Sequence, residues 1–566
     1  MRTFRYVLSG AALIVLAACK DTLLVDNQNQ ADRNRALGTF TDLEAFLGSG
    51  YATAHNAVLG ANDALQTQML VMGLENISGL ANFAMGPRGA VPRVQIDNQP
   101  NGTGDAGNLR DFTFGHRAAR IASLSLAKLK TLSSGSPTQD GRDRAFCYFV
   151  RGVALGNLSL AYDSASILTE NDDPQATIPL SGYQAVNAAA LRDLDSAFAI
   201  TNANAAGFPL PSTWINGNAL TAPQFIQFIR SYKARLRASV ARSPAERASV
   251  DWTQVYGDAT NGIAADFIVQ MNPSAGWDVV WPAQAFATGS ASWHQMSQFI
   301  LGMADNSGQY DIWLNTPRSN RLPFVVQTTD LRLPQGATRA AQIGDTLRPG
   351  FKNFYVSGTT TNPGRPYVRN RPTGEDAPQD PFGFSMYDFN RTRTFALTSP
   401  ARTGPYPIMT IAEMQLLAAE GQLRLNSPAL AIPLINLTRA DANRGGLPAL
   451  PLTIGDTTVA TNVVPGGASC VPRVPDVATN FKSTKCGNVW DALKWEYRIE
   501  TMYTGYGMWY FAARGWGDLP EGTAMSWPVP NEEMLTRSQP FYGLGGVGGA
   551  ASSGKGNYGL FSGGVY

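Results

Sequence analysis

Aromatic side chains alternate with polar ones between residues 277 and 313. Flat aromatic faces stack on the C–H side of sugar rings, and amide or charged groups bind the hydroxyls, since a buried hydroxyl without a partner is costly. This stretch is therefore a candidate for binding a sugar without catalysis. The alternative is that the rings form the small core of a loop-rich region. The aromatic candidates are Trp277, Trp281, Trp293, Tyr310 and Trp313.

The carboxylates and histidines give less support for an enzyme. Glu496 and Glu500 are one helical turn apart, about 6 Å along the axis, which is near the carboxylate spacing of retaining glycosidases. Two carboxylates on one helix face cannot easily flank a substrate, so we interpret them as part of an ion network with Arg498 and neighbouring residues. The histidines lack the spacing of zinc ligands, and we predict neither a metal site nor a cofactor. They are His55, His116 and His294.

The charge balance argues against a nucleic-acid partner. The chain of 566 residues has 45 basic and 43 acidic side chains, for a net charge of +2. A protein that binds nucleic acid through phosphate contacts normally concentrates positive charge, and the sequence contains no sustained basic run.

The N-terminus has the layout of a secretory signal. Arg2 and Arg5 precede an apolar stretch that is too short to span a bilayer, which takes about 20 residues. Small residues before Cys19 resemble the lipobox of bacterial lipoproteins, in which the cysteine is lipidated and becomes the new N-terminus. The alternative is an ordinary signal peptide with a chance cysteine. We predict a signal peptide over residues 1–18 and a lipidated, polar tether over residues 19–38.

The remaining cysteines differ in their surroundings. Cys470 and Cys486 lie in one stretch rich in Gly, Pro and Val. In the oxidising compartment that a secretory signal implies, they are expected to form a disulfide. Cys147 lies among apolar residues, so a small buried thiol is expected there.

The hydrophobic pattern predicts a mainly α-helical chain with long loop excursions and a few short β-strands. The first helix is expected to open at a capping box, Thr41 to Glu44. Gly152 and Gly156 are small enough to let another helix approach closely. Residues 272–405 are rich in Trp, Pro and Gly, and the tail from residue 541 is expected to be irregular. Further helices are expected over 111–133, 139–163, 184–201, 222–243, 251–270, 407–426, 428–443 and 489–514.

Four stretches of the chain carry distinctive motifs. The first two are FTDLEAFLGSGY (40–51) and RAFCYFVRGVALGNLSLAYD (144–163). The third includes Asn436-Leu-Thr-Arg439 followed by Gly445-Gly446-Leu447-Pro448. The fourth includes the Glu- and Arg-rich helix from residue 491, then Arg514-Gly-Trp-Gly517 and Pro528-Val-Pro530. In content and order, these stretches resemble the SusD/RagB family of outer-membrane nutrient-binding lipoproteins.

The resemblance implies one helical body over residues 39–566, built on four tetratricopeptide-like helix pairs, with a loop-rich ligand region at about 272–405. It implies a glycan or similar nutrient as ligand and a SusC-like TonB-dependent transporter as partner. In the family, glycan-contacting aromatics come from loops, so the five aromatic residues above are the candidate ligand contacts. Asn82, in an earlier excursion, is a further candidate.

The resemblance also implies an outer-membrane location, with the body held by a lipid on Cys19. Lys20-Asp21 directly after the cysteine is similar to the start of surface-exported lipoproteins, which favours exposure on the cell surface. The function expected is non-catalytic capture of a nutrient and delivery to the transporter. The alternative is a lipid-anchored helical scaffold that binds other proteins and no small molecule.

Overall fold

The structure is a computed structural model that describes most of the chain after the N-terminal segment. The described residues are 37–60, 63–77, 84–101, 107–173, 175–280, 295–345, 366–373, 385–392, 395, 402–455 and 458–566. The predicted signal peptide, Cys19 and all but the last two residues of the tether lie outside these ranges. No helix in the described ranges is both long and apolar enough to cross a membrane.

Helices dominate the described residues. The helices of the body are α3 (Phe40–Val58), α6 (Asn108–Lys128), α7 (Pro137–Ala161), α8 (Tyr183–Ala203), α9 (Ala222–Ser239), α11 (Trp252–Thr260), α17 (Ile411–Arg424), α18 (Pro428–Arg439), α19 (Val489–Thr501) and α20 (Met508–Trp516). Shorter helices are α4 (Leu65–Met72), α5 (Met85–Gly89), α10 (Pro244–Ala248), α13 (Gln298–Leu301), α14 (Gln309–Asn315), α15 (Arg339–Gly344) and α21 (Asn531–Thr536).

The named strands are short and form antiparallel pairs. They are β1 (Gln95–Asp97) with β10 (Gly543–Gly545), β2 (Ser164–Ser166) with β3 (Leu180–Gly182), β4 (Phe267–Met271) with β7 (Gly404–Met409), β5 (Val368–Asn370) with β6 (Tyr387–Phe389), and β8 (Arg473–Pro475) with β9 (Thr484–Cys486). A mainly α-helical fold with a few short strands is therefore confirmed.

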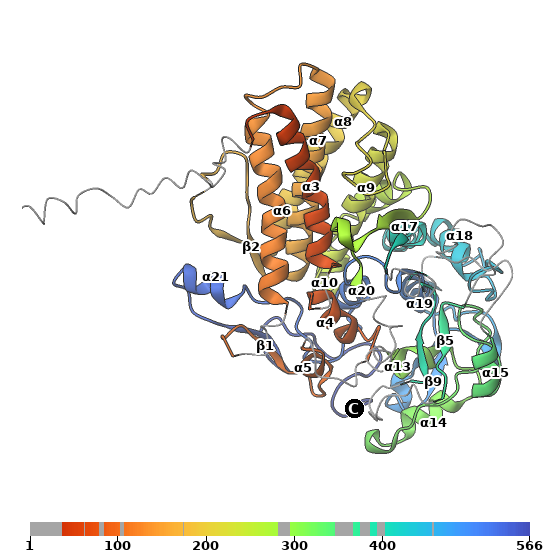
Figure 1. The fold of residues 1–566 in the computed structure, drawn as a ribbon. Helices are drawn as coiled ribbons and strands as arrows, with labels where there is room; N and C mark the ends of the chain where they lie inside the picture. Colours follow the sequence, from red (N-terminus) through yellow and green to blue (C-terminus); the bar gives the residue numbers. More distant parts are fainter. Residues whose placement is uncertain are drawn as a thin grey trace, which may run out of the picture.

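The body helices form a row of pairs: α3 with α6, α7 with α8, α9 with α11, and α17 with α18. Each pair also contacts the next, and Figure 1 shows α3, α6, α7 and α8 standing side by side. As expected, small residues allow close approach. A Cβ on Gly156 of α7 would lie 2.4 Å from Cδ1 of Leu236 on α9, and one on Gly152 would lie 2.8 Å from Cγ of Leu194 on α8.

Residues 295–345, 366–373 and 385–392 are the described parts of the long excursion after β4, and they are called the excursion below. The excursion shares a buried apolar cluster with Trp495 and Ile499 of α19, separate from the cluster that fills the helix pairs. Figure 1 shows this region beside α19, at the end of the row of helices.

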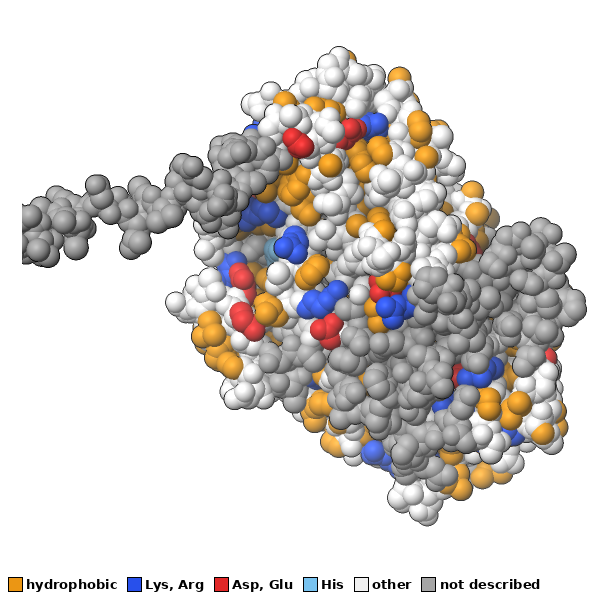
Figure 2. Space-filling model, viewed as in Figure 1, with side chains coloured by type: hydrophobic (Ala, Val, Ile, Leu, Met, Phe, Trp, Pro, Cys, Tyr) orange, Lys and Arg blue, Asp and Glu red, His pale blue; other side chains and the backbone are white. Residues whose placement is uncertain are grey.

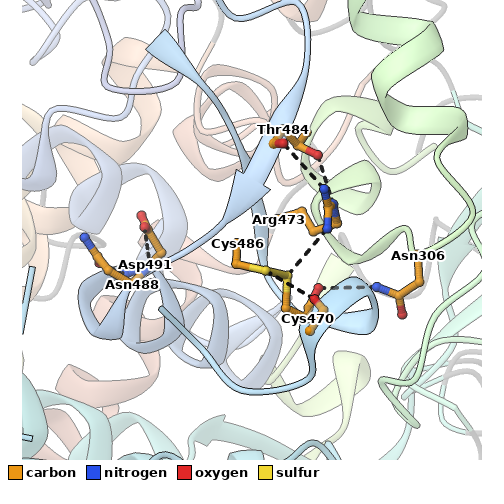
Figure 3. Close-up of a disulfide and its surroundings, with 8 residues drawn as sticks. Asn306, Cys470, Arg473, Thr484, Cys486, Asn488 and Asp491 are labelled. Carbon is orange, nitrogen blue, oxygen red and sulfur yellow. Dashed lines mark hydrogen bonds between the residues drawn. A yellow bond between two sulfur atoms is a disulfide. The ribbon is translucent and has the colours of Figure 1, made fainter. Parts of the chain in front are cut away.

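The expected disulfide between Cys470 and Cys486 is present (Figure 3). It closes the β8–β9 hairpin, and the Asn306 side-chain amide donates to the Cys470 carbonyl at 3.3 Å. Cys147 is free and buried in α7, as expected. The bridge therefore ties the hairpin together, and Asn306 ties the hairpin to the excursion.

Two predicted helices are too long. The expected helix over 251–270 ends at Thr260, and residues 267–271 form β4, in which Phe267, Val269 and Met271 are buried. That alternation has the period of a strand rather than a helix. The expected helix over 489–514 divides into α19 and α20. Tyr503, Gly505 and Gly507 adopt positive φ between them, and two of these residues are glycines, which adopt this conformation readily.

Two smaller predictions were also wrong. The first helix begins earlier than expected, because Thr39 rather than Thr41 is its N-cap and accepts from the Asp42 amide. The tail is not irregular throughout, since Gly543–Gly545 forms β10 and pairs with β1. Glycines that suggested an irregular tail instead allow close contact between the two strands: a Cβ on Gly543 would lie 2.4 Å from Cδ of Gln95 in β1.

Candidate ligand sites

Three of the predicted aromatic contacts are buried. The exposed fractions of Trp277, Tyr310 and Trp313 are 4%, 1% and 4%. Trp277 packs on α3, with its ring 6.1 Å from Tyr51 and 5.4 Å from His55. A ring that stacks on a sugar needs a free face, and all three rings are almost fully covered, so the structure gives these candidate contacts no support.

Tyr310 and Trp313 form part of the core of the excursion. Their rings stack at 6.0 Å, and the Tyr310 hydroxyl donates to the Phe299 carbonyl at 2.7 Å. The Arg321 guanidinium lies 4.5 Å from the Trp313 ring. The alternative interpretation, in which tryptophans form a small loop core, therefore holds for this pair. The sequence pattern could not separate the two, because both uses require aromatic residues in a loop-rich stretch.

The other three candidates, Asn82, Trp281 and Trp293, lie outside the described residues and stay predictions. The residues that flank them are described, however, and they meet. Ile77 and Gln295 form an isolated antiparallel bridge, and the Ile77 amide donates to the Gln295 carbonyl at 2.6 Å. The two stretches that carry these candidates thus adjoin a common point of the body. Nothing in the sequence pattern predicted that Ile77 and Gln295, more than 200 positions apart, would pair, because a single bridge leaves no periodic signal.

A groove of about 620 Å³ lies between α6, α21 and the segment around β2. We call it the basic groove, and its lining includes Phe46, Phe112, Ile121, Leu168, Arg117 and Arg120. Figure 2 shows basic side chains and a histidine over α6 on this face. The groove was not predicted from the sequence, although Thr113, Arg117 and Arg120 share one face of a helix by their spacing.

Two polar side chains in the basic groove already have partners within the protein. Nδ1 of His116 bonds the Phe112 carbonyl at 2.8 Å, and its Nε2 accepts from the Ser166 amide at 3.2 Å. This pattern requires a neutral ring, and burial lowers the pKa of His116 in agreement. Arg537 donates to Glu533, to the Ile178 carbonyl and to the Ser166 hydroxyl. Both residues therefore hold the walls of the groove in place.

A second groove of about 720 Å³ lies between α9, α11, α17 and α18. Its lining is mainly apolar and includes Ile226, Ile411, Met414 and Leu437. Its lining residues come from the helix pairs and their connecting loops, and none comes from the excursion. We call it the helical groove.

Glu496 and Glu500 are not placed as a catalytic pair. Both are buried, and Arg332 donates to Glu496 at 2.6 Å and to Glu500 at 3.1 Å. Burial raises the pKa of Glu500, but Arg444, Arg391 and Arg332 outweigh it and hold the pKa below its ordinary value. The predicted ion network exists, but Arg498 is not its cation and pairs instead with Asp518 at 2.7 Å. A carboxylate in this setting has neither solvent nor room for a substrate.

Comparison with known proteins finds similarity to solved structures only. No family model and no curated protein matches the sequence. Several solved structures do match the fold. A SusD superfamily protein from Parabacteroides distasonis aligns with a TM-score of 0.53 at 10% identity, over 89% of this chain and 98% of that one.

Two further structures agree. A SusD superfamily protein from Bacteroides vulgatus aligns with a TM-score of 0.51 at 15% identity, over 88% of this chain and 90% of that one. A SusD-like protein from Bacteroides fragilis aligns with a TM-score of 0.50 at 12% identity, over 89% and 97%. Each alignment covers most of both chains. The chain therefore has the fold of the SusD superfamily.

Proposed function

We propose that this protein is a non-catalytic, lipid-anchored binding protein of the outer membrane. It captures an oligosaccharide or a similar nutrient at the cell surface and passes it to a SusC-like TonB-dependent transporter. The shared fold supports this function, because it extends over nearly the whole length of the SusD superfamily structures. The small residues before Cys19 support the anchor, since a lipidated cysteine there would fix one end of the body to a membrane.

The bridge between Ile77 and Gln295 is the observation that carries the ligand site. It brings together the flanks of the stretches that contain Asn82, Trp281 and Trp293. An amide and two indole rings have the chemistry that a sugar requires, namely a hydrogen-bonding group and stacking faces. With Trp277, Tyr310 and Trp313 in the core, these three residues are the candidate contacts.

Calorimetric titration with a panel of neutral oligosaccharides tests the ligand site. We expect Trp281→Ala or Trp293→Ala to weaken the best ligand at least about tenfold, which corresponds to about 1.4 kcal/mol. Trp490→Ala is the matched control, because Trp490 is a half-buried tryptophan on α19 that packs against Arg424. Unchanged affinity in both loop variants would contradict the site.

Two experiments test the anchor and the partner. Cys19→Ala should release the protein from the membrane fraction, because the acyl chains provide the binding energy. Purification of a tagged, detergent-solubilised copy should recover a TonB-dependent transporter. Recovery of other proteins without a transporter, together with no heat for any glycan or peptide, would instead favour the helical scaffold.

A further inference from the structure

The basic groove has the size and composition of a small-molecule site. Ligand pockets usually enclose about 300–1,000 Å³ and combine an apolar lining with a few placed polar groups. This groove has about 620 Å³, with Phe46, Phe112 and Leu168 among its apolar lining residues. No residue next to Ile77 or Gln295 lines it.

The charges that line the groove do not balance. Its titratable residues are His116, Arg117, Arg120, Glu533 and Arg537. His116 is neutral, and Glu533 is paired with Arg537 at 2.6 Å. Among the described residues, neither Arg117 nor Arg120 forms an ion pair. Two positive charges are therefore left over on one wall.

The two arginines are placed to act together. They are three residues apart on α6, which puts their side chains on the same face of the helix. Arg117 also lies over the Phe114 ring at 5.6 Å, which orients its guanidinium. A guanidinium presents donors in a planar fork that matches a carboxylate or a sulfate. The apolar lining beside it suits the non-polar part of the same molecule.

We propose that the basic groove binds an organic anion, a carboxylate or sulfate attached to a sugar or to another body with apolar faces. Arg117 and Arg120 hold the anionic group, and Phe46, Phe112 and Leu168 contact the body of the ligand. We assign no ligand contact to Arg537 or His116, because Arg537 is paired with Glu533 and both ring nitrogens of His116 are hydrogen-bonded.

A pair of matched ligands tests the proposal on the full mature chain. The ligand 4-nitrophenyl β-D-glucuronide differs from 4-nitrophenyl β-D-glucoside only in having a carboxylate where the glucoside has a hydroxymethyl group. We expect the glucuronide to bind at least about tenfold more tightly, since hydrogen bonds to charged groups are the stronger class. Equal affinity for the two ligands in calorimetric titration would overturn the proposal.

Substitutions then assign the effect to the groove. Arg117→Gln combined with Arg120→Gln should remove the preference for the glucuronide, and Arg120→Lys should keep part of it. Arg192→Gln is the matched control, because Arg192 is an exposed arginine on α8 outside the groove. A preference that survives in the double variant would refute the assignment.

Two further measurements separate the groove from other sites. Inorganic sulfate should compete weakly, since it lacks a body for the apolar lining to contact. Competition as strong as that of the glucuronide would overturn the role of the lining. Trp281→Ala and Trp293→Ala should leave glucuronide binding unchanged, so the groove and the proposed nutrient site can fail independently.

Discussion

The helix pairs and the excursion provide hydrogen-bond partners for their backbone N–H and C=O groups in different ways. In the pairs, each helix forms its own backbone hydrogen bonds, so neighbouring helices need only fit in shape. Gly152 and Gly156 provide that fit on α7. In the excursion, side chains must bond the loop backbone. Asp305 accepts from the Gln327 and Tyr310 amides, and Arg321 donates to the carbonyls of residues 313, 314 and 316.

The excursion also depends on one buried cation. Arg332 binds Asp330, Glu496 and Glu500 and thereby connects a loop to α19. Ion pairs cross the helix pairs as well, as between Arg235 and Glu413, but each acts beside a continuous apolar contact. Regular elements can therefore be held by packing, whereas irregular backbone requires specific polar partners.

Arg332→Met should have the largest effect on stability. It would leave three buried carboxylates without their shared cation, and breaking a buried ion pair typically costs about 3–5 kcal/mol. The loss would appear as a lower midpoint of urea unfolding. Arg192→Met is the matched control, since Arg192 is exposed and should change stability by less than about 0.5 kcal/mol.

Hydrogen exchange would show where Arg332→Met acts. Amides of residues 305–345 should exchange faster, while those of α7 should keep their protection, because α7 lies in the other apolar cluster. Equal loss of protection in both regions would contradict the conclusion that the excursion depends on the Arg332 ion pairs and the helix pairs do not.

Gly156→Ala tests packing in the helix pairs and should have an intermediate effect. The added Cβ would lie 2.4 Å from Leu236, which is fully buried, and such overpacking costs about 2 kcal/mol. Gly257→Ala on α11 is the matched control, because a Cβ there meets nothing within 4 Å. It should stabilise the protein by about 0.5–1 kcal/mol, as alanine is the better helix former. Urea unfolding of both variants measures the contrast.

Glu75→Gln tests the junction between the two regions through pH. Glu75 follows α4, and the Tyr503 amide after α19 donates to it at 2.6 Å. Burial raises the pKa of Glu75 from 4.5 to about 8, so the unfolded chain loses this proton at lower pH than the folded protein. Stability should therefore fall as pH rises through this range, by at most about 1.4 kcal/mol per pH unit.

The variant should flatten that dependence, because glutamine does not ionise. Thermal unfolding measured across the range from about pH 4.5 to about pH 8 gives the slope. Glu532→Gln is the control, since Glu532 is exposed on α21 and its loss should leave the slope as it is in the parent. An unchanged slope in Glu75→Gln would show that this carboxyl is not the group responsible.

Local pattern was sufficient to predict most of the helices and the small-residue contacts. The disulfide was also predictable, because Cys470 and Cys486 lie in one short stretch. The end of α11 at residue 260 and the end of α19 at residue 501 could not be predicted from the sequence, because the residues on either side are compatible with a helix. The strand β4 forms because β7 lies beside it, and α19 ends where Tyr503, Gly505 and Gly507 turn.

The sequence by itself determined the residue types available for function: aromatic rings in the excursion, a cysteine after a signal-like segment, and arginines spaced along α6. Only the tertiary structure decided which of them are free. It places Trp277, Tyr310 and Trp313 in the core and pairs Ile77 with Gln295. It also pairs Glu533 with Arg537, whereas Arg117 and Arg120 form no ion pair with any residue that the structure describes. Exposure and charge balance depend on neighbours that are distant in the chain, and the local spacing of residues cannot predict those neighbours.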